Sequence, residues 1–206
     1  MRIITISRQF GSGGRELGKR LADELSFDYY DKEIITAIAE KQGLDEKYVE
    51  TALNQQGWRA FPLTFRQSFS YLGGGNNMHL NLLLEQKRII ENIAKTGRDC
   101  VVVGRNADVL LAQEKPFNIF VCADMQSRIF RCEERAAEDE NLSRKEIENN
   151  IRRIDKTRAK TRELLTDSPW GECETYHVTL NTTGWDIKEL VPAVKELALR
   201  YWESRK

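Results

Sequence analysis

Histidine and cysteine are scarce in this chain, and neither is arranged as a metal site requires. The 206 residues include two histidines and four cysteines, with no C-x-x-C pair among them. Zinc sites and disulfide frameworks need closer or denser ligands. The sequence therefore argues against a metal centre and histidine-based chemistry, and it indicates free thiols in a reducing compartment. The cysteines are Cys100, Cys122, Cys132 and Cys173.

Long apolar runs and a net charge of either sign are also missing. No run approaches the roughly 20 residues of a membrane helix, and the start, MRIITISRQF, lacks the organisation of a signal peptide. We therefore expect a cytoplasmic protein with no membrane segment. Lys plus Arg and Asp plus Glu each number 32, so the formal charge is zero. Proteins that grip nucleic acid usually carry a positive field, so nucleic acid is not expected as the main partner.

What the chain does contain is the alternating pattern of an α/β domain. Hydrophobic residues make up 40% and charged residues 31%, enough to bury a core. Short apolar runs without in–out alternation predict parallel strands covered on both faces, and helical stripes lie between them. Together they predict a three-layer fold, an open parallel sheet with helices on both faces. The predicted strands are Ile3–Ile6, Phe27–Tyr30, Cys100–Val103, Phe117–Val121 and Tyr176–Leu180. The predicted stripes are Leu17/Leu21/Leu25, Ile34/Ile35/Ile38, Leu80/Leu83/Leu84/Ile90/Ile93 and Leu190/Val194/Leu197/Trp202.

Two segments fit this sheet poorly. Gly57–Asn77 is aromatic, basic and then glycine-rich, which indicates a mobile excursion, although its aromatic residues also fit a helical core stripe. Glu138–Arg162 is rich in charge of both signs and carries isoleucines at helical spacing, typical of a solvated helix. Its last part, however, gathers cations: Arg152, Arg153, Lys156, Arg158, Lys160 and Arg162.

The most informative segment is the glycine-rich turn after the first predicted strand. Gly11, Gly13 and Gly14 fall within four positions, and a helix opens directly after them. Such a turn aims backbone N–H groups and a positive helix end at one point, which favours phosphate binding. The alternative is a tight turn that binds nothing.

The usual lysine of a phosphate-binding loop is missing from this turn. A search for G-x-x-x-x-G-K-[ST] finds a near match ending at Lys19, but the stripe from Leu17 to Leu25 puts Lys19 inside the helix. Alignment on the end of the strand instead puts Gly14 at the lysine position and Arg15 at the metal-binding hydroxyl. Either Arg15 or Arg8 then supplies the cation, as a planar fork rather than a point charge.

Five segments, in order, resemble the cytidylate kinase-like family of P-loop nucleotide kinases. They are ITISRQFGSGGRELGKRLADEL, YYDKEII, VVVGRNADVLL, RRIDKTRAKTR and VTLNTTGWDIKELV. The resemblance implies the P-loop kinase fold, with ATP and Mg²⁺ as cofactors and a small-molecule nucleotide as substrate. It also implies one domain, with a core (1–30, 98–137, 174–206), an acceptor-binding excursion (31–97) and a lid (138–173).

The resemblance assigns roles to loop and strand-end residues. The donor phosphates would lie on Gly11, Ser12, Gly13, Gly14, Arg15 and Glu16. Asp31 matches an aspartate that seats the acceptor, although a helix N-cap explains it as well. Arg105, in VGRN, matches the family's D-G-R-D and would clamp a phosphate at a strand end. Its flanking aspartates are Val103 and Asn106 here, which puts charge-dependent recognition of cytosine or metal in question.

The lid segment matches R-x-D-x-x-R-x-R at Arg153, Asp155, Arg158 and Lys160. On a helix, Arg153 and Lys160 share one face while Asp155, Arg158 and Arg162 share another, so Asp155 can hold an arginine in place. The alternative is a solvated helix with i,i+4 pairs. LNTT (Leu180–Thr183) matches the turn near the donor base, and His79 takes the place of an acceptor-binding arginine.

These matches predict an ATP-dependent kinase of a small phosphate-bearing acceptor such as CMP or dCMP. Arg15, Arg153, Arg158 and Lys160 would be catalytic, with Arg105, Asp31 and Asp155 at the acceptor; Mg²⁺ would be held through water or by Ser12 or Ser7. Two alternatives remain open: a nucleotide-binding regulatory protein with impaired catalysis, and a kinase of a non-nucleotide small molecule. The sequence gives no oligomeric state.

Overall fold

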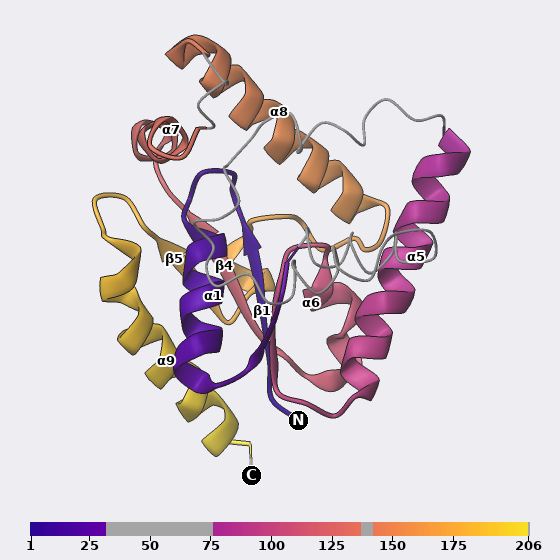
Figure 1. Cartoon of the computed structure of the whole chain (residues 1–206). Coiled ribbons are helices and arrows are strands. Elements are labelled where there is room, and N and C mark those ends of the chain that lie inside the picture. The colour runs from indigo at the N-terminus through magenta and orange to yellow at the C-terminus, as the bar shows by residue number, and fades with distance from the viewer. Residues whose placement is uncertain (32–75, 137–141, 206) are drawn as a thin grey trace, which may run out of the picture.

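A computed structural model describes residues 1–31, 76–136 and 142–205. Its sheet has five parallel strands in the order β2-β3-β1-β4-β5 (Figure 1). The strands are β1 (Ile3–Arg8), β2 (Asp28–Tyr30), β3 (Cys100–Val103), β4 (Phe117–Cys122) and β5 (Val178–Asn181). The helices are α1 (Gly14–Leu25), α5 (Asn76–Lys95), α6 (Ala107–Leu110), α7 (Met125–Glu133), α8 (Arg144–Glu163) and α9 (Ile187–Glu203), with 3₁₀ turns at Ala112–Glu114 and Cys173–Thr175.

Helices cover both faces of the sheet, which confirms the predicted three-layer α/β class. Ile4 and Ile6 of β1 point to the face where α1 and α9 pack, while Ile3 belongs to the core under α5 and α6 (Figure 1). Successive side chains of a strand point to opposite faces, and both faces of β1 are buried because both are covered. The central strands therefore have no in–out alternation.

A third apolar cluster joins the glycine-rich turn to the two helices above it. Phe10, at the turn, packs with Ile129 of α7 and with Ile151 and Ile154 of α8. Helix α8 begins at a capping box in which Ser143 and Glu146 each bond the other's backbone N–H. This cluster fixes α7 and α8 beyond the carboxyl ends of the strands, where α/β proteins bind ligands.

Three sequence expectations on burial and strand limits were wrong. β5 starts at Val178, not at Tyr176, and its residues alternate between half-buried and exposed. The reason is that β5 is an edge strand, paired only with β4 among the described strands. Leu84 and Leu197, placed in helical core stripes, are 57% and 49% exposed. In α9 the buried face runs through Val194 and Ala198, so Leu197 lies beside that face and not on it.

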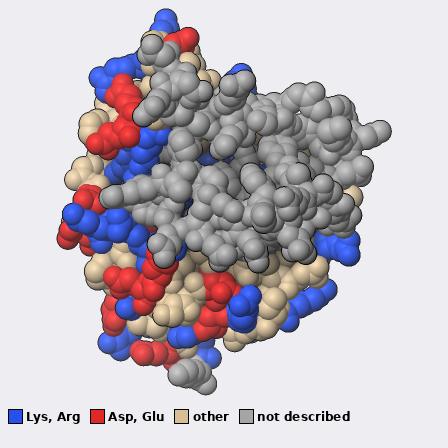
Figure 2. All heavy atoms as spheres, in the orientation of Figure 1, with Lys and Arg blue, Asp and Glu red and all other residues tan. Residues whose placement is uncertain are grey.

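Other predictions lie outside the described residues. These are the isoleucine stripe at Ile34, Ile35 and Ile38 and the excursion at Gly57–Asn77, except that Asn76 and Asn77 open α5. All four cysteines are free thiols. None of the described helices is long and apolar enough to cross a membrane. On the face in Figure 2, basic and acidic side chains are interspersed over the described surface, in keeping with the balanced composition.

Candidate functional site

The glycine loop (Gly11–Glu16) connects β1 to α1 in the register that alignment on the strand end predicted. β1 ends at Arg8, α1 begins at Gly14, and Gly13 is its N-cap with a φ of 82°. Lys19 lies inside α1 and pairs with Asp23, one turn later. The lysine of the rejected near match is therefore not at the loop.

Backbone N–H groups of the glycine loop are left for a ligand. Within the described residues, those of Gly11, Gly13, Gly14 and Glu16 donate to no protein acceptor, while that of Ser12 makes a long 3.4 Å bond to the Gln9 carbonyl oxygen. The first N–H groups of a helix have no partner inside the helix, and with the helix dipole they attract anions. This geometry fits a phosphate cradle.

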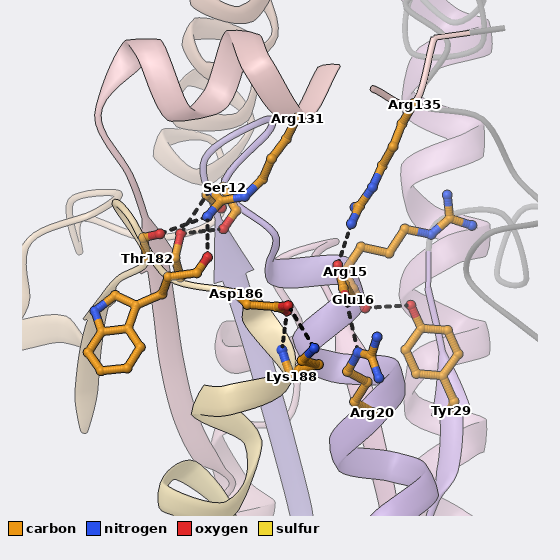
Figure 3. A network of polar contacts seen from close by, with 11 residues as sticks. Ser12, Arg15, Glu16, Arg20, Tyr29, Arg131, Arg135, Thr182, Asp186 and Lys188 are labelled. Atoms are coloured by element: carbon orange, nitrogen blue, oxygen red, sulfur yellow. Dashed lines mark hydrogen bonds and ion pairs between the residues drawn. The ribbon is translucent and has the colours of Figure 1, made fainter. Parts of the chain in front are cut away.

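The outer side of the loop is fastened to the turn between β5 and α9 (Figure 3). The Thr182 hydroxyl donates to the Ser12 carbonyl oxygen at 2.8 Å, and the Arg131 guanidinium donates to the carbonyl oxygens of Thr182 and Trp185 at 2.7 and 3.1 Å. Burial, followed by repulsion from Arg135, lowers the pKa of Arg131. The structure thus brings the LNTT turn into contact with the loop.

Arg15 and Asp31, both predicted site residues, form an ion pair. The Arg15 Nε atom donates to a carboxylate oxygen of Asp31 at 2.9 Å, and the Tyr29 hydroxyl donates to the same oxygen at 3.1 Å. In Figure 3 the Arg15 guanidinium points away from Ser12. The Asp31 carboxylate is 3% exposed, so the pair is held rigidly at the end of β2. The helix that Asp31 was alternatively expected to cap lies outside the described residues.

Glu16 contributes to the loop through its backbone. Its buried carboxylate accepts from Arg20 at 2.8 Å and from Arg135, and so ties α1 to the segment after α7 (Figure 3). The predicted contact with the donor phosphates therefore falls to the N–H group of Glu16, not to its carboxylate.

Asp155 of α8 connects the lid helix to the loop. Its carboxylate accepts from the Phe10 N–H at 2.8 Å, pairs with Arg128 of α7, and lies 3.7 Å from the Arg158 guanidinium. The expectation that Asp155 holds an arginine is confirmed, with Arg128 as the closer partner. Its predicted role at the substrate stays a prediction, since these contacts are all within the protein.

Arg158 belongs to an arginine cluster (Arg8, Arg105, Arg128, Arg158), whose other members all act electrostatically on it. Arg158 donates to the Arg8 carbonyl oxygen at 2.8 Å. Burial first, then repulsion from Arg8, lowers the pKa of Arg158, with Asp155 acting in the opposite direction. Arg8, Arg128 and Arg105 all repel the Arg158 guanidinium, and a phosphate group is an anion that arginines gathered in this way can bind by charge-assisted hydrogen bonds.

The carboxyl end of β3 has a constrained backbone at the predicted clamp. Gly104, Arg105 and Asn106 follow one another with φ angles of 83°, 56° and 52°. Residues other than glycine adopt such angles at a cost of the order of 1–3 kcal/mol, and they gather at binding sites. The strain presents Arg105 at the end of the strand.

The other two predicted cations lie on the far face of α8. Arg153 and Lys160 are exposed, and Arg153 makes a 3.4 Å bond to Asn150, one turn earlier. Arg162, on the opposite face, forms a buried pair with Asp108 at 2.6 Å. The predicted division of this helix into two faces is confirmed, and only the face with Asp155 and Arg158 meets the loop.

Sequence reasoning missed Arg128, Arg131 and the Asp108–Arg162 pair. Arg128, Arg131 and Arg135 recur at intervals of three and four residues, and this cationic stripe was the available signal. Nothing in the spacing paired Asp108 with Arg162, which are far apart in the chain.

A cavity of about 1040 Å³ lies beside the glycine loop, between α1, α7 and the turn before α9. Glu16, Arg131 and Lys188 are among its lining residues, and cationic side chains outnumber acidic ones there. Two aromatic side chains of the lining, Phe130 and Trp185, are 55% and 54% exposed. The volume lies just above the range of about 300–1,000 Å³ that is usual for small-molecule pockets.

The described residues offer no all-protein cage for Mg²⁺, an ion that is usually held by one or two protein groups together with substrate phosphates and water. They contain no group of three or more His, Cys, Asp or Glu side chains that could ligate a metal. The Ser12 hydroxyl donates to the Gln9 carbonyl oxygen, and the Ser7 hydroxyl faces Asp108, which is paired with Arg162. Both hydroxyls donate their hydrogen atoms within the protein and keep their oxygen lone pairs, so the role of Ser12 or Ser7 at Mg²⁺ stays a prediction.

Comparison with known families finds a match over most of the chain. The model of the cytidylate kinase-like family matches residues 3–184. No curated protein sequence is significantly similar to the chain.

Two solved structures share the fold over nearly the whole chain. An uncharacterized protein from Eubacterium ventriosum is 22% identical with a TM-score of 0.69, covering 99% of each chain. A shikimate kinase from Acinetobacter baumannii, solved with shikimate, is 13% identical with a TM-score of 0.57, covering 98% of this chain and 94% of its own. The fold is thus that of the P-loop kinases, and the chain belongs to the cytidylate kinase-like family.

Proposed function

We propose that this protein transfers the terminal phosphoryl group of ATP to a small phosphate-bearing acceptor, most simply a nucleoside monophosphate such as CMP or dCMP. Family membership supports the coarser part, a kinase of a small molecule. The observation that carries the proposal is the glycine loop, with its N–H groups left for an anion beside the arginine cluster.

The donor lies with its phosphates on the glycine loop and its base in the adjoining cavity. The lining supplies exposed Phe130 and Trp185, whose rings offer stacking surfaces for a base. The triphosphate then runs from the cavity along the amino end of α1 toward the ends of β1 and β3.

The acceptor lies on the other side of the loop. Arg15 and Asp31 form a rigid pair there, and Arg105 stands at the end of β3. Arginine binds phosphate with two parallel N–H donors, which fixes orientation as well as charge. Arg105 clamps the acceptor phosphate, and Arg15 and Asp31 border its binding region.

Catalysis in this arrangement is positioning and charge stabilisation. Phosphoryl transfer spreads charge over the oxygens of the transferring group, and cations fixed around it lower the barrier without a strong base. Arg158 is held in place through Asp155 and the Arg8 carbonyl oxygen. Arg153 and Lys160 stay candidates only if α8 presents its exposed face to the ligand.

The test is an ADP-release assay with ATP, Mg²⁺ and a panel of acceptors. ADP formed only when one nucleoside monophosphate is present supports the proposal. ADP formed only with a small molecule that is not a nucleotide identifies a different acceptor class. Nucleotide that raises the melting temperature without any ADP indicates a regulatory protein, because a ligand stabilises by mass action whether or not it reacts.

A further inference from the structure

The position that lysine occupies in phosphate-binding loops is Gly14 here, and the side chain of Arg8 lies across it. Any side chain at position 14 would bring its Cβ atom within 2.7 Å of the Arg8 Cβ atom and 3.1 Å of its Cγ atom. Packed atoms do not approach so closely. The arginine at position 8 and a lysine at position 14 are therefore alternatives in this arrangement.

The other end of Arg8 lies against a second glycine. A Cβ atom at Gly104 would collide with the Nη1 atom of Arg8. Two glycines from different strand ends thus make room for one side chain, with the apolar stem over Gly14 and the guanidinium over Gly104. Long cationic side chains commonly pack their stems in this way while the head reaches a polar region.

In this position the Arg8 guanidinium lies at the crevice between the carboxyl ends of β1 and β3. The two strands are neighbours, with Ile6 paired to Val103. The helices that follow them, α1 and α6, leave for opposite faces of the sheet, since α1 packs in the core with α9 and α6 in the core with α5. Ligands of open α/β sheets bind outside the carboxyl ends of the strands at such a switch point.

We propose that Arg8 performs the task of the missing lysine by binding the β- and γ-phosphate oxygens of a triphosphate held on the glycine loop. The inference rests on the proposed function. Arg158, which donates to the Arg8 carbonyl oxygen at 2.8 Å, and Arg105, which follows Gly104, stand beside it. The site replaces the point charge of an ammonium group with a planar fork.

Inorganic tripolyphosphate is the probe, because it has the phosphate chain without base or sugar. Arg8→Met keeps the apolar stem over Gly14 and removes the charge, while Lys19→Met removes a cation of α1 that pairs with Asp23. By isothermal titration calorimetry we expect the Kd to rise about 10- to 100-fold in Arg8→Met and less than about twofold in Lys19→Met. Arg8→Lys should retain part of the affinity.

A transposition tests the geometry directly. Arg8→Gly removes both the stem and the charge, and adding Gly14→Lys returns a cation at the usual position. We expect the folded double variant to bind tripolyphosphate more tightly than Arg8→Gly alone. No gain in a double variant with a native circular dichroism spectrum would overturn the assignment of Gly14.

The outcomes separate the inference from the proposed function. If Arg8→Met binds tripolyphosphate as tightly as the wild type, while the wild type binds ATP, the inference is wrong and the proposed function stands. If the wild type binds neither ATP nor tripolyphosphate, both are wrong. The melting temperature of Arg8→Met without ligand shows whether this variant folds. If it does not fold, Arg8→Lys, which keeps both stem and charge, is measured in its place.

Discussion

Replacement of Asp155 by Asn tests whether one carboxylate keeps the arginine cluster together. The side chains of Asp155 and Arg128 are only 14% and 6% exposed, and Arg158 lies 3.7 Å from the same carboxylate. Asn keeps one acceptor oxygen for the Phe10 N–H and loses the second oxygen, which accepts from Arg128, so the change removes the charge and that hydrogen bond. Breaking a buried ion pair on one side costs about 3–5 kcal/mol, because the other charge stays buried without compensation.

The expected loss of stability follows from the burial of the ion pair, and an exposed ion pair on the same helix, α8, provides a control. We expect the lower end of that range, about 3 kcal/mol, since the site retains some solvent; in a chain of this size it lowers the melting temperature by roughly 6–12 °C. Glu148→Gln on the same helix breaks a pair with Arg152 in which the side chains are 37% and 65% exposed. Such surface pairs contribute about 0.5 kcal/mol or less.

The assay is thermal unfolding of the three proteins with and without tripolyphosphate. An anion replaces part of the lost negative charge, so tripolyphosphate should raise the melting temperature of Asp155→Asn by more than that of the wild type. Equal melting temperatures for Asp155→Asn and Glu148→Gln would refute the reasoning, because they would mean that the cluster does not depend on its carboxylate.

Four further results are expected. Arg15→Ala should lower turnover about 10-fold or more and Lys19→Ala less than about twofold; equal effects in steady-state assays would place the loop in the wrong register. Arg105→Ala should raise the KM of the acceptor and leave the Kd of ATP unchanged, and an effect on ATP alone would contradict its assignment. Trp185→Ala should weaken ATP binding by about 1–3 kcal/mol and leave tripolyphosphate binding unaffected, since only ATP has a base to stack; calorimetry with both ligands decides this. Chelation by EDTA should leave tripolyphosphate binding intact because arginines beside the loop can bind the phosphate chain directly, and loss of binding would contradict the cluster's role.

Local patterns predicted the architecture because the burial of each strand and helix is visible in the spacing of its own apolar residues. The first strand, the loop and the start of α1 were found because strand burial, glycine and helical spacing change within a dozen residues. Leu197 shows the limit: its spacing fits the stripe of α9, but the buried face runs through Val194 and Ala198 beside it, and only the packed structure decides which side of a helix meets the core.

Contacts between distant segments were beyond the sequence. Spacing showed that Asp155 and Arg158 share a face of the helix, but it did not show that Arg128 and the Phe10 N–H complete the site. Arg15 was expected at the donor phosphates, whereas its side chain pairs with Asp31 at the end of β2. Ion pairs of this kind depend on how elements pack, and a single sequence carries no record of it.

Phe10 has a mechanical consequence. Its ring belongs to the apolar cluster of α7 and α8, its N–H bonds to Asp155, and its carbonyl oxygen accepts from Arg128 at 2.7 Å. The residue before the first glycine of the loop is thus built into the helices above it. A ligand that displaces the loop must therefore also displace α8. Because such coupling is reciprocal, a change in the position of α8 changes the affinity of the loop for its anion.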